Sequence, residues 1–295
     1  MSRFAGVHVA TTTPFSPGEL SVDLDRYRAH VTWLIDEGID GLIPMGSLGE
    51  YESLSPDERR AVVEATVEMA DGRVLVVPGV SGPSSRVACE HAAHAASVGS
   101  DGVMVLPPTN HAATPAELVA HFSAVAEVGL PVIVYNNPFS TRVDLTPDLL
   151  ARLARIDGIV GVKEFSGDVR RVSAILELAP TLEVLCGADD LALESALMGA
   201  TGWIGGFTGV FPRETQHVFH LGRKGNVEEA LTLYRSLLPV LRWDTTPRFV
   251  EAIKLAIDLA GGAGGGEVRP PRLRLPDGDV SRIRASVAAI RGVAE

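Results

Sequence analysis

The sequence predicts an α/β protein, a (β/α)8 TIM barrel with a C-terminal helical extension. Short apolar segments typical of strands alternate eight times with amphipathic segments typical of helices. Most of the apolar segments are continuous, as expected for parallel strands that are buried on both faces. This alternation takes about 225 residues, within the usual size of a barrel of this kind. A doubly wound open sheet is the weaker alternative, because no glycine-rich dinucleotide-binding motif follows the first strand.

The eight predicted strands share short length and a high content of β-branched and other apolar residues. They cover residues 7–13, 41–46, 74–80, 102–106, 131–135, 159–165, 182–187 and 203–207.

The predicted helices lie between these strands, and several have clear start sequences. Ser55-Pro56-Asp57-Glu58 combines a capping serine, a proline at the first helical position and a glutamate that completes a capping box. Thr114-Pro115 and Thr146-Pro147 repeat the same kind of start. The other helices are expected at residues 23–36, 85–97, 169–178, 191–198 and 213–221.

The pattern changes after Lys224. Three helical segments, at residues 227–241, 248–259 and 279–290, follow one another without strands. A glycine-rich loop at residues 261–266 and an extended Arg269-Pro270-Pro271-Arg272 segment separate the last two. The sequence therefore predicts a barrel at residues 1–224 and a helical extension at residues 225–295 that packs on it.

Composition narrows the class of protein. Net charge is −11 and no basic block is present, which argues against nucleic acid and anionic membranes as partners. No apolar run has the length of a membrane span, and the N-terminus lacks the features of a signal peptide. Cys89 and Cys186 are expected to be buried free thiols, so a cytoplasmic protein is predicted. The eight histidines show no metal-binding spacing, so no metal site is expected.

Lysine is scarce in this chain, occurring only at Lys163, Lys224 and Lys254. Lys163 stands at the carboxyl end of an apolar strand, where barrel enzymes place their catalytic groups. Arginine does not deprotonate in proteins, but a lysine can when burial lowers its pKa. Our hypothesis is that Lys163 forms a Schiff base with a carbonyl or imine substrate. The ordinary alternative is a lysine that extends from a strand end into solvent.

Two other strand ends carry groups suited to this chemistry. In Gly46-Ser47-Leu48-Gly49-Glu50, the turn can aim backbone N–H groups at a carboxylate, and Ser47 offers a hydroxyl. An ordinary loop explains this motif equally well. In Tyr135-Asn136-Asn137-Pro138, the phenol can carry protons to and from a substrate on Lys163. The alternative for Tyr135 is packing on the barrel rim.

The remaining strand ends are less specific. Asp189 and Asp190 suggest a metal site, but no third ligand follows, so we expect Asp190 to cap the next helix. The glycines in Gly202-Trp203-Ile204-Gly205-Gly206 allow either a close approach of the backbone to a ligand or tight packing. Glu164 is expected to point to the opposite face of its strand from Lys163.

These motifs together resemble the dihydrodipicolinate synthase / N-acetylneuraminate lyase family of class I lyases, in order and spacing over nearly the whole chain. The resemblance implies a barrel enzyme with a covalent Schiff base on Lys163 and no other cofactor. It implies that Tyr135 shuttles protons, with Ser47 as its hydroxyl partner. It implies a small 2-oxo acid or imino acid as substrate and a homo-oligomer, a tetramer or a dimer. The substrate-binding residues that it implies are Gly46, Leu48, Thr109, Asn137, Ile204 and Gly205.

The departures from the family suggest which branch this is. Thr109 stands in place of a relay tyrosine and Ser140 in place of a carboxylate-binding arginine, which argues against lysine-biosynthetic activity. Leu48 is larger than the residue most of the family has there. The segments at residues 189–195, 211–214 and 268–273 resemble the 1-pyrroline-4-hydroxy-2-carboxylate deaminase branch. We therefore predict a Schiff-base deaminase; a pyruvate-dependent aldolase or condensing enzyme and a non-catalytic ligand-binding barrel are the alternatives.

Overall fold

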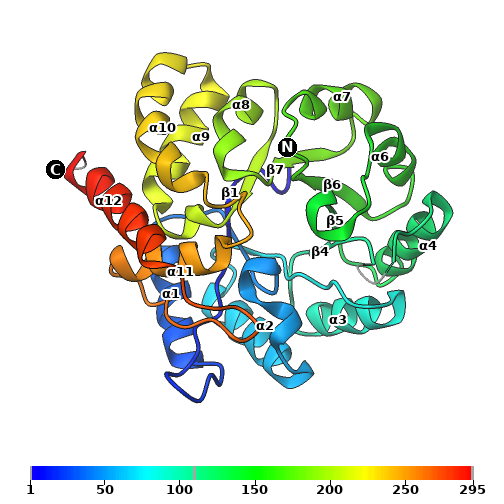
Figure 1. Cartoon of the computed structure of the whole chain (residues 1–295). Helices are drawn as coiled ribbons and strands as arrows, with labels where there is room; N and C mark the ends of the chain where they lie inside the picture. Colours follow the sequence, from blue (N-terminus) through cyan, green and yellow to red (C-terminus); the bar gives the residue numbers. More distant parts are fainter. Residues whose placement is uncertain (1, 109–110, 294–295) are drawn as a thin grey trace.

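A computed structural model describes residues 2–108 and 111–293 and has the predicted (β/α)8 barrel with C-terminal helices. All neighbouring strands are parallel, in the order β3-β2-β1-β8-β7-β6-β5-β4. Figure 1 shows the strands in the middle of the molecule with helices around them. The strands are β1 Gly6–Ala10, β2 Gly41–Ile43, β3 Leu75–Val76, β4 Val103–Val105, β5 Val132–Asn136, β6 Ile159–Glu164, β7 Glu183–Cys186 and β8 Gly202–Gly205.

The barrel closes between β3 and β4 through a single bridge rather than a full ladder. Val80 N–H donates to the Met104 carbonyl at 2.9 Å, and Met104 N–H donates to the Pro78 carbonyl at 2.9 Å. Pro78 has no N–H to donate toward β4, which limits this pairing to the bridge. β3 is shorter than the predicted strand at residues 74–80, although the N–H groups of Val77 and Gly79 still donate to the Leu42 and Pro44 carbonyls at 2.9 and 2.7 Å.

The helices of the barrel begin where their capping residues predict. Ser55 and Thr114 form complete capping boxes with Glu58 and Glu117, and Thr146 caps α6. The predicted cap at Asp190 is wrong, because a 3-10 turn, η3 (Asp189–Leu191), runs directly into α8. The helices are α1 Leu24–Asp36, α2 Pro56–Ala70, α3 Ser85–Ser97, α4 Pro115–Ala126, α5 Pro138–Thr141, α6 Pro147–Leu153, α7 Arg170–Leu178, α8 Ala192–Leu197 and α9 Pro212–Lys224.

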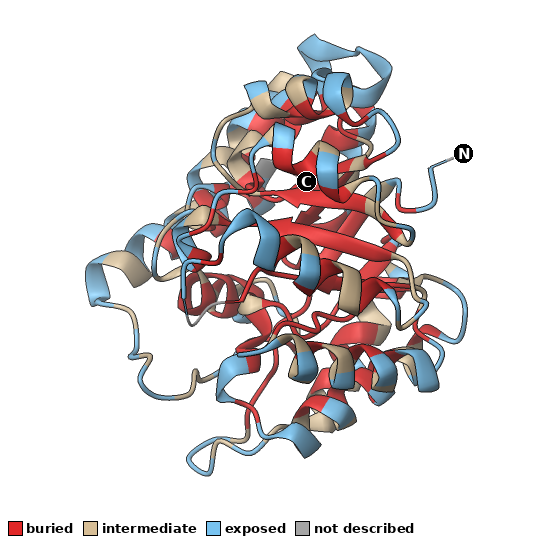
Figure 2. Cartoon of the chain, turned by 90° about the vertical axis from the view of Figure 1, so that its right-hand side faces the viewer, coloured by how far each residue is buried: buried red, intermediate tan, exposed pale blue. Residues whose placement is uncertain are grey.

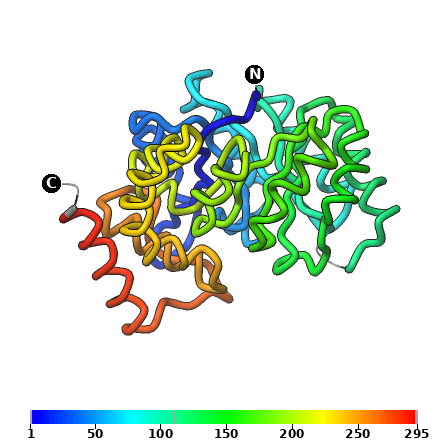
Figure 3. The backbone as a smooth tube through the Cα atoms, turned by 90° about the horizontal axis from the view of Figure 1, so that it is seen from above, coloured from blue at the N-terminus to red at the C-terminus, as the bar shows by residue number. Residues whose placement is uncertain are grey.

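Three further helices follow the barrel: α10 Val227–Leu241, α11 Phe249–Leu259 and α12 Asp277–Val293. α10 packs on α8 and α9, and α12 packs on α10 and α11. Figure 3 shows α12 at the outer edge of the molecule. α11 contacts the 3-10 turn η1 (Ser47–Gly49) that follows β2, so the extension reaches the carboxyl ends of the strands.

Burial follows the barrel architecture. Figure 2 shows buried strands inside and helices with exposed outer faces. Side chains from several strands, including Ile43, Met104, Ile133, Leu185 and Ile204, share one core cluster. Both cysteines are free; Cys186 is buried, but Cys89 is partly exposed, contrary to expectation. Within the described residues, no helix is long and apolar enough to cross a membrane.

Candidate active site

A cavity of about 530 Å³ opens at the carboxyl ends of the strands. Its wall combines the turn after β2, the ends of β5 and β6, the loops after β7 and β8, and the connection between α10 and α11. The lining includes Gly46, Ser47, Leu48, Tyr135, Asn137, Lys163, Asp190, Gly206 and Asp244, with an outer part that contains Phe139, Phe165, Leu191, Pro247 and Phe249.

Lys163 lies within this cavity, near the end of β6, and is 6% exposed. Its Nζ stands 4.5 Å from the centre of the Tyr135 ring, because the two residues are register partners on β5 and β6. Within the described chain, no carboxylate forms an ion pair with it. Burial lowers the pKa of Lys163, although the nearby Asp244 and Asp189 oppose this shift. The amine is therefore placed to react in its neutral form.

Glycine makes room for the lysine side chain. A Cβ on Gly187, at the end of β7, would lie 3.1 Å from both Cγ and Cε of Lys163 and 2.9 Å from the Glu164 carbonyl oxygen. The side chain of Lys163 therefore runs close over the backbone of the neighbouring strand end.

Tyr135 is buried, and burial raises the pKa of its phenol. Its hydroxyl oxygen accepts a hydrogen bond of 3.0 Å from the Asn137 amide. Ser47, the expected hydroxyl partner of Tyr135, lines the same cavity from η1, and among the described residues the two hydroxyls are not hydrogen-bonded to each other. The structure thus brings Lys163, Tyr135 and Ser47 to one cavity and gives Tyr135 a partner in Asn137.

The turn after β2 presents backbone to the cavity. Gly46 is extended and η1 begins at Ser47, and the first N–H groups of a helical turn have no acceptor inside it. The N–H groups of Ser47 and Leu48 are therefore suited to an anion. The bulk of Leu48 fits because the facing residue is Gly206, where a Cβ would lie 3.0 Å from Leu48 Cδ2.

Two predicted substrate contacts on β8 lie outside the cavity lining. Ile204 is buried in the barrel core, and Gly205 packs against Asp189 and the Trp203 indole, where a Cβ would overlap both. Gly206 lines the cavity in place of Gly205, which faces Asp189 and Trp203 instead. Thr109 falls outside the described residues.

Sequence reasoning missed Asp244, which reaches the cavity from the connection between α10 and α11. Asp244 Oδ2 accepts the backbone N–H of Asp189 at 3.2 Å. Asp189 in turn accepts N–H groups of Trp203 at 2.8 Å, Phe207 at 2.8 Å and Gly206 at 3.2 Å. The one sequence indication was an aspartate between two apolar helices.

Burial raises the pKa of both aspartates, but their surroundings differ. Three N–H donors favour the charged form of Asp189, whereas the charge of Asp189 raises the pKa of Asp244 further. Asp244 therefore binds a proton more readily than Asp189 does. The cavity thus combines an amine whose pKa is lowered by burial with a carboxyl group whose pKa is raised by burial and by the charge of Asp189.

Glu164 lies on the opposite face of β6, as the alternation of side chains along a strand predicts. It accepts hydrogen bonds from the Asn136 amide at 3.0 Å and from Ser166 N–H at 2.6 Å. Asn136 Oδ1 also accepts Leu145 N–H at 2.9 Å. These bonds hold the ends of β5 and β6, and with them Tyr135 and Lys163, in position.

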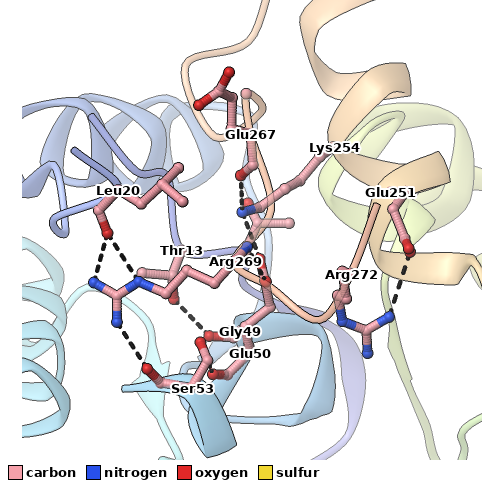
Figure 4. A network of polar contacts seen from close by, with 12 residues as sticks. Thr13, Leu20, Gly49, Glu50, Ser53, Glu251, Lys254, Glu267, Arg269 and Arg272 are labelled. Carbon is pink, nitrogen blue, oxygen red and sulfur yellow. Dashed lines mark hydrogen bonds and ion pairs between the residues drawn. The ribbon is translucent and has the colours of Figure 1, made fainter. Parts of the chain in front are cut away.

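A second polar network, drawn in Figure 4, holds the turn after β2 against the C-terminal extension. Lys254 Nζ donates to Glu50 Oε1 at 2.6 Å and to the Glu267 carbonyl at 2.8 Å. Glu50 Oε2 accepts Arg269 N–H at 3.0 Å, and the Arg269 guanidinium donates to the Leu20 and Ser53 carbonyls. We call Glu50, Lys254 and Arg269 the locking network, because it anchors η1 beside the cavity.

No cluster of three or more histidine, cysteine, aspartate or glutamate side chains suited to a metal ion occurs among residues 2–108 and 111–293. Of the two aspartates after β7, Asp189 accepts backbone and indole N–H groups instead.

Comparisons with known proteins agree with the family resemblance that the sequence motifs indicate. The model of the dihydrodipicolinate synthetase family matches residues 3–290. The 4-hydroxy-tetrahydrodipicolinate synthase of Nitratidesulfovibrio vulgaris is 36% identical over 294 residues, covering 97% of this chain and 98% of the relative. That of Methanospirillum hungatei is 34% identical over 279 residues, covering 92% and 93%.

Solved structures of dihydrodipicolinate synthases and related proteins superpose closely on this chain. The dihydrodipicolinate synthase of Aquifex aeolicus superposes with a TM-score of 0.91 at 29% identity, covering 98% of each chain. A prophage protein of E. coli K12, solved in complex with pyruvate, gives a TM-score of 0.92 at 30% identity and covers 98% of this chain and 99% of that chain. The relatives named here are synthases or related proteins rather than the deaminase expected from the sequence.

Proposed function

This chain belongs to the dihydrodipicolinate synthetase family, and we propose that Lys163 forms the Schiff base through which it acts as a lyase. Enzymes of this family hold the substrate covalently on a lysine and use no separate cofactor. The observation that carries the proposal is the state of Lys163, which is buried in the cavity beside Tyr135 without an ion-pair partner among the described residues. A nucleophilic amine needs this state, because only the deprotonated form attacks a carbonyl carbon.

The first step joins Lys163 to C2 of a 2-oxo acid such as pyruvate. The lone pair of Nζ attacks C2, the carbonyl oxygen takes up protons and leaves as water, and a C=N bond remains. Asp244 supplies a proton to the departing oxygen from the cavity wall. The backbone N–H groups of Ser47 and Leu48 hold the substrate carboxylate.

The second step uses the nucleophilic carbon that the Schiff base creates. Tyr135 relays the proton from C3, which gives an enamine. The enamine adds through C3 to an aldehyde carbon, whose oxygen takes up a proton, and water then hydrolyses the imine and frees Lys163. The reverse sequence cleaves the same carbon–carbon bond. Pyruvate is our first substrate candidate, since a related protein of known structure holds it.

The cavity favours a second reactant without a negative charge. Of its described lining residues, Lys163 is the one basic side chain, and Asp190 and Asp244 are acidic. Ser140 lines the cavity where the sequence resemblance expects an arginine for an aldehyde's carboxylate. We therefore propose carbon–carbon bond formation or cleavage with a partner other than the carboxylated aldehyde of lysine biosynthesis.

Deamination of 1-pyrroline-4-hydroxy-2-carboxylate is the second candidate, favoured by Asp244. Lys163 attacks the C=N carbon, the ring nitrogen leaves as an amine, and a ketimine forms. Loss of the C3 proton then expels the 4-hydroxyl as water, and a protonated carboxyl such as Asp244 assists that departure. A proton then moves from C5 to C3 through the conjugated system, which leaves an imine at C5. Hydrolysis of this imine releases ammonia, and hydrolysis of the ketimine frees Lys163 and releases 2-oxoglutarate semialdehyde. This substrate has a single carboxylate, which suits the same cavity.

Reduction with borohydride tests the proposal, because it converts a Schiff base into a stable secondary amine. The chain is incubated with pyruvate or with the pyrroline substrate, reduced, digested and analysed by mass spectrometry. We expect an adduct on Lys163, and none on the exposed Lys224 or on the paired Lys254. Release of ammonia identifies deamination, and consumption of an aldehyde with pyruvate identifies the carbon–carbon lyase.

Lys163→Met is the matched variant, with Lys224→Met as its control. Lys163→Met should lose the adduct and all turnover, while Lys224→Met should retain both. Tight binding of a 2-oxo acid without an adduct on Lys163 would refute the proposal and identify a ligand-binding barrel.

A further inference from the structure

Three aromatic rings form a row that leads outward from Lys163. Lys163 Nζ lies over the Tyr135 ring, the Tyr135 and Phe165 rings meet edge to face at 6.5 Å, and Phe165 and Phe139 do the same at 6.5 Å. All three rings line the cavity. The row therefore runs from the buried amine to the cavity mouth, where Phe139 on α5 is 73% exposed.

Other apolar side chains also line this outer part of the cavity. They are Leu191 after β7, together with Pro247 and Phe249 at the start of α11. Three of the nine phenylalanines in an aromatic-poor chain thus line one cavity. Phe139 contributes little to the core, since most of its surface stays in water, so its ring is available to an apolar group that binds at the mouth.

Charge at the mouth disfavours an anionic ligand group. Beyond Lys163, no described lining residue is basic, and the carboxylate of Asp190 would repel a second carboxylate. The nearest arginines of the C-terminal segment are engaged elsewhere: Arg269 binds Glu58 and backbone carbonyls, and Arg272 pairs with Glu251 at 3.4 Å. A phosphate or carboxylate at the far end of the substrate would have to compete with these pairings, because the two arginines line the adjoining cavity rather than this one.

The polar groups at the mouth are largely satisfied inside the protein. The hydroxyls of Thr245 and Thr246 donate to the Arg242 and Trp243 carbonyls at 3.1 and 2.8 Å. The Asn137 amide donates to Tyr135, and its Oδ1 accepts Ser140 N–H at 3.1 Å. A sugar-like chain with several hydroxyls would therefore find few free donors along this wall.

We propose that the outer part of the cavity, formed by Phe139, Phe165, Leu191, Pro247 and Phe249, binds an uncharged apolar group at the end of the substrate remote from its carboxylate. An aromatic ring or a branched alkyl chain fits this description. The cavity has room for it, because about 530 Å³ greatly exceeds what a three-carbon 2-oxo acid fills. This inference rests on the proposed Schiff-base function and names the substrate class that it serves.

Equilibrium binding to the full-length chain tests the inference. Two 2-oxo acids of similar length are compared by calorimetry, 2-oxo-4-phenylbutanoate with an apolar end and 2-oxoadipate with a carboxylate end. Partial burial of the phenyl ring should make the first bind about tenfold or more tightly than the second. Equal affinities, or tighter binding of 2-oxoadipate or of a polyhydroxylated 2-oxo acid, would overturn the inference.

The variant Phe139→Ala tests whether the preference for the phenyl compound depends on the row of aromatic rings. The exposed position of Phe139 means that its removal leaves the fold intact, and we expect most of the preference for the phenyl compound to disappear. Leu273→Ala is the matched control, because Leu273 is also 73% exposed but does not line the cavity. An unchanged preference in Phe139→Ala would exclude the proposed binding site.

Borohydride trapping of pyruvate on Lys163 in the same preparations separates the two proposals. Trapping without any preference for the apolar ligand overturns the apolar site alone. A preference that depends on Phe139, without trapping on Lys163, supports the apolar site and overturns the Schiff-base function.

Discussion

Two buried lysines in this chain have matched surroundings and opposite roles. Lys163 is 6% exposed, with Nζ 4.5 Å from the Tyr135 ring centre, and Lys254 is fully buried, with Nζ 4.3 Å from the Phe15 ring centre. Burial lowers the pKa of both amines. The difference is the carboxylate: Glu50 lies 2.6 Å from Lys254, whereas no carboxylate within the described chain pairs with Lys163.

This difference shows that burial alone does not make a lysine reactive. The charge of Glu50 and its hydrogen bond raise the pKa of Lys254 against the effect of burial and hold the ammonium in place. Lys254 does not line the cavity and instead ties η1 to α11. A buried lysine that pairs with a carboxylate stabilises the fold. A buried lysine that faces a cavity and has no such partner can act as a nucleophile.

Removal of the Lys163 amine should give the largest change. Lys163→Met keeps the volume and the neutral state of the side chain but removes the nucleophile, so activity should fall at least about a thousandfold. Steady-state rates and borohydride trapping measure this loss. The melting temperature should stay close to that of the native chain, since Lys163 has no ion pair with any residue that the structure describes. Residual activity above a tenth of the native rate would contradict the assignment.

Removal of the Lys254 amine should instead affect stability. Lys254→Met leaves Glu50 buried without its cation and should lower the free energy of unfolding by about 3–5 kcal/mol. Denaturation in urea measures this change. Lys254→Met combined with Glu50→Gln should recover part of the loss, because the uncompensated charge is gone. If Lys254→Met alone were as stable as Lys163→Met, the proposed contrast between the two lysines would be wrong.

Asp244→Asn should have an intermediate effect on rate. Loss of a positioned proton donor should lower kcat about a hundredfold, with the Schiff base on Lys163 still trapped by borohydride. Asp244→Glu, which keeps the acid, should lose less. Full activity in Asp244→Asn would show that the carboxyl serves only to position Asp189.

The pH dependence of activity distinguishes the contributions of Lys163 and Asp244. Activity needs neutral Lys163, so kcat/KM should rise with pH through a pKa below the 10.5 of an ordinary lysine. Activity also needs protonated Asp244, whose pKa is raised, so the rate should fall again on the alkaline side. The alkaline fall should be absent in Asp244→Asn. Its persistence in that variant would assign it to a different group.

The smallest effect on stability is expected for Arg272, whose ion pair lies outside the locking network and is partly exposed. Its guanidinium pairs with Glu251 at 3.4 Å and is 30% exposed, so water screens the pair. Arg272→Gln should lower the free energy of unfolding by less than about 1 kcal/mol. A loss as large as that of Lys254→Met would mean that burial does not decide the strength of these pairs.

Much of the barrel was determined locally by the sequence. Continuous apolar runs specified the strands, and the capping boxes at Ser55 and Thr114 specified helix starts, because these interactions join residues within one turn. The position of Lys163 at a strand end followed from the same pattern. The sequence-based expectations at Asp190 and Gly205 differ from the structure, since a 3-10 turn and tight packing on Trp203 decide those positions.

Tertiary structure alone decided which groups surround each lysine. Lys254 and Glu50 are 204 positions apart, and Asp189 and Asp244 are 55 apart, so no local pattern links them. Barrel closure and the packing of the C-terminal helices bring these pairs together. The sequence by itself placed a lysine at the end of β6; that no carboxylate among the described residues pairs with its amine is a property of the folded chain.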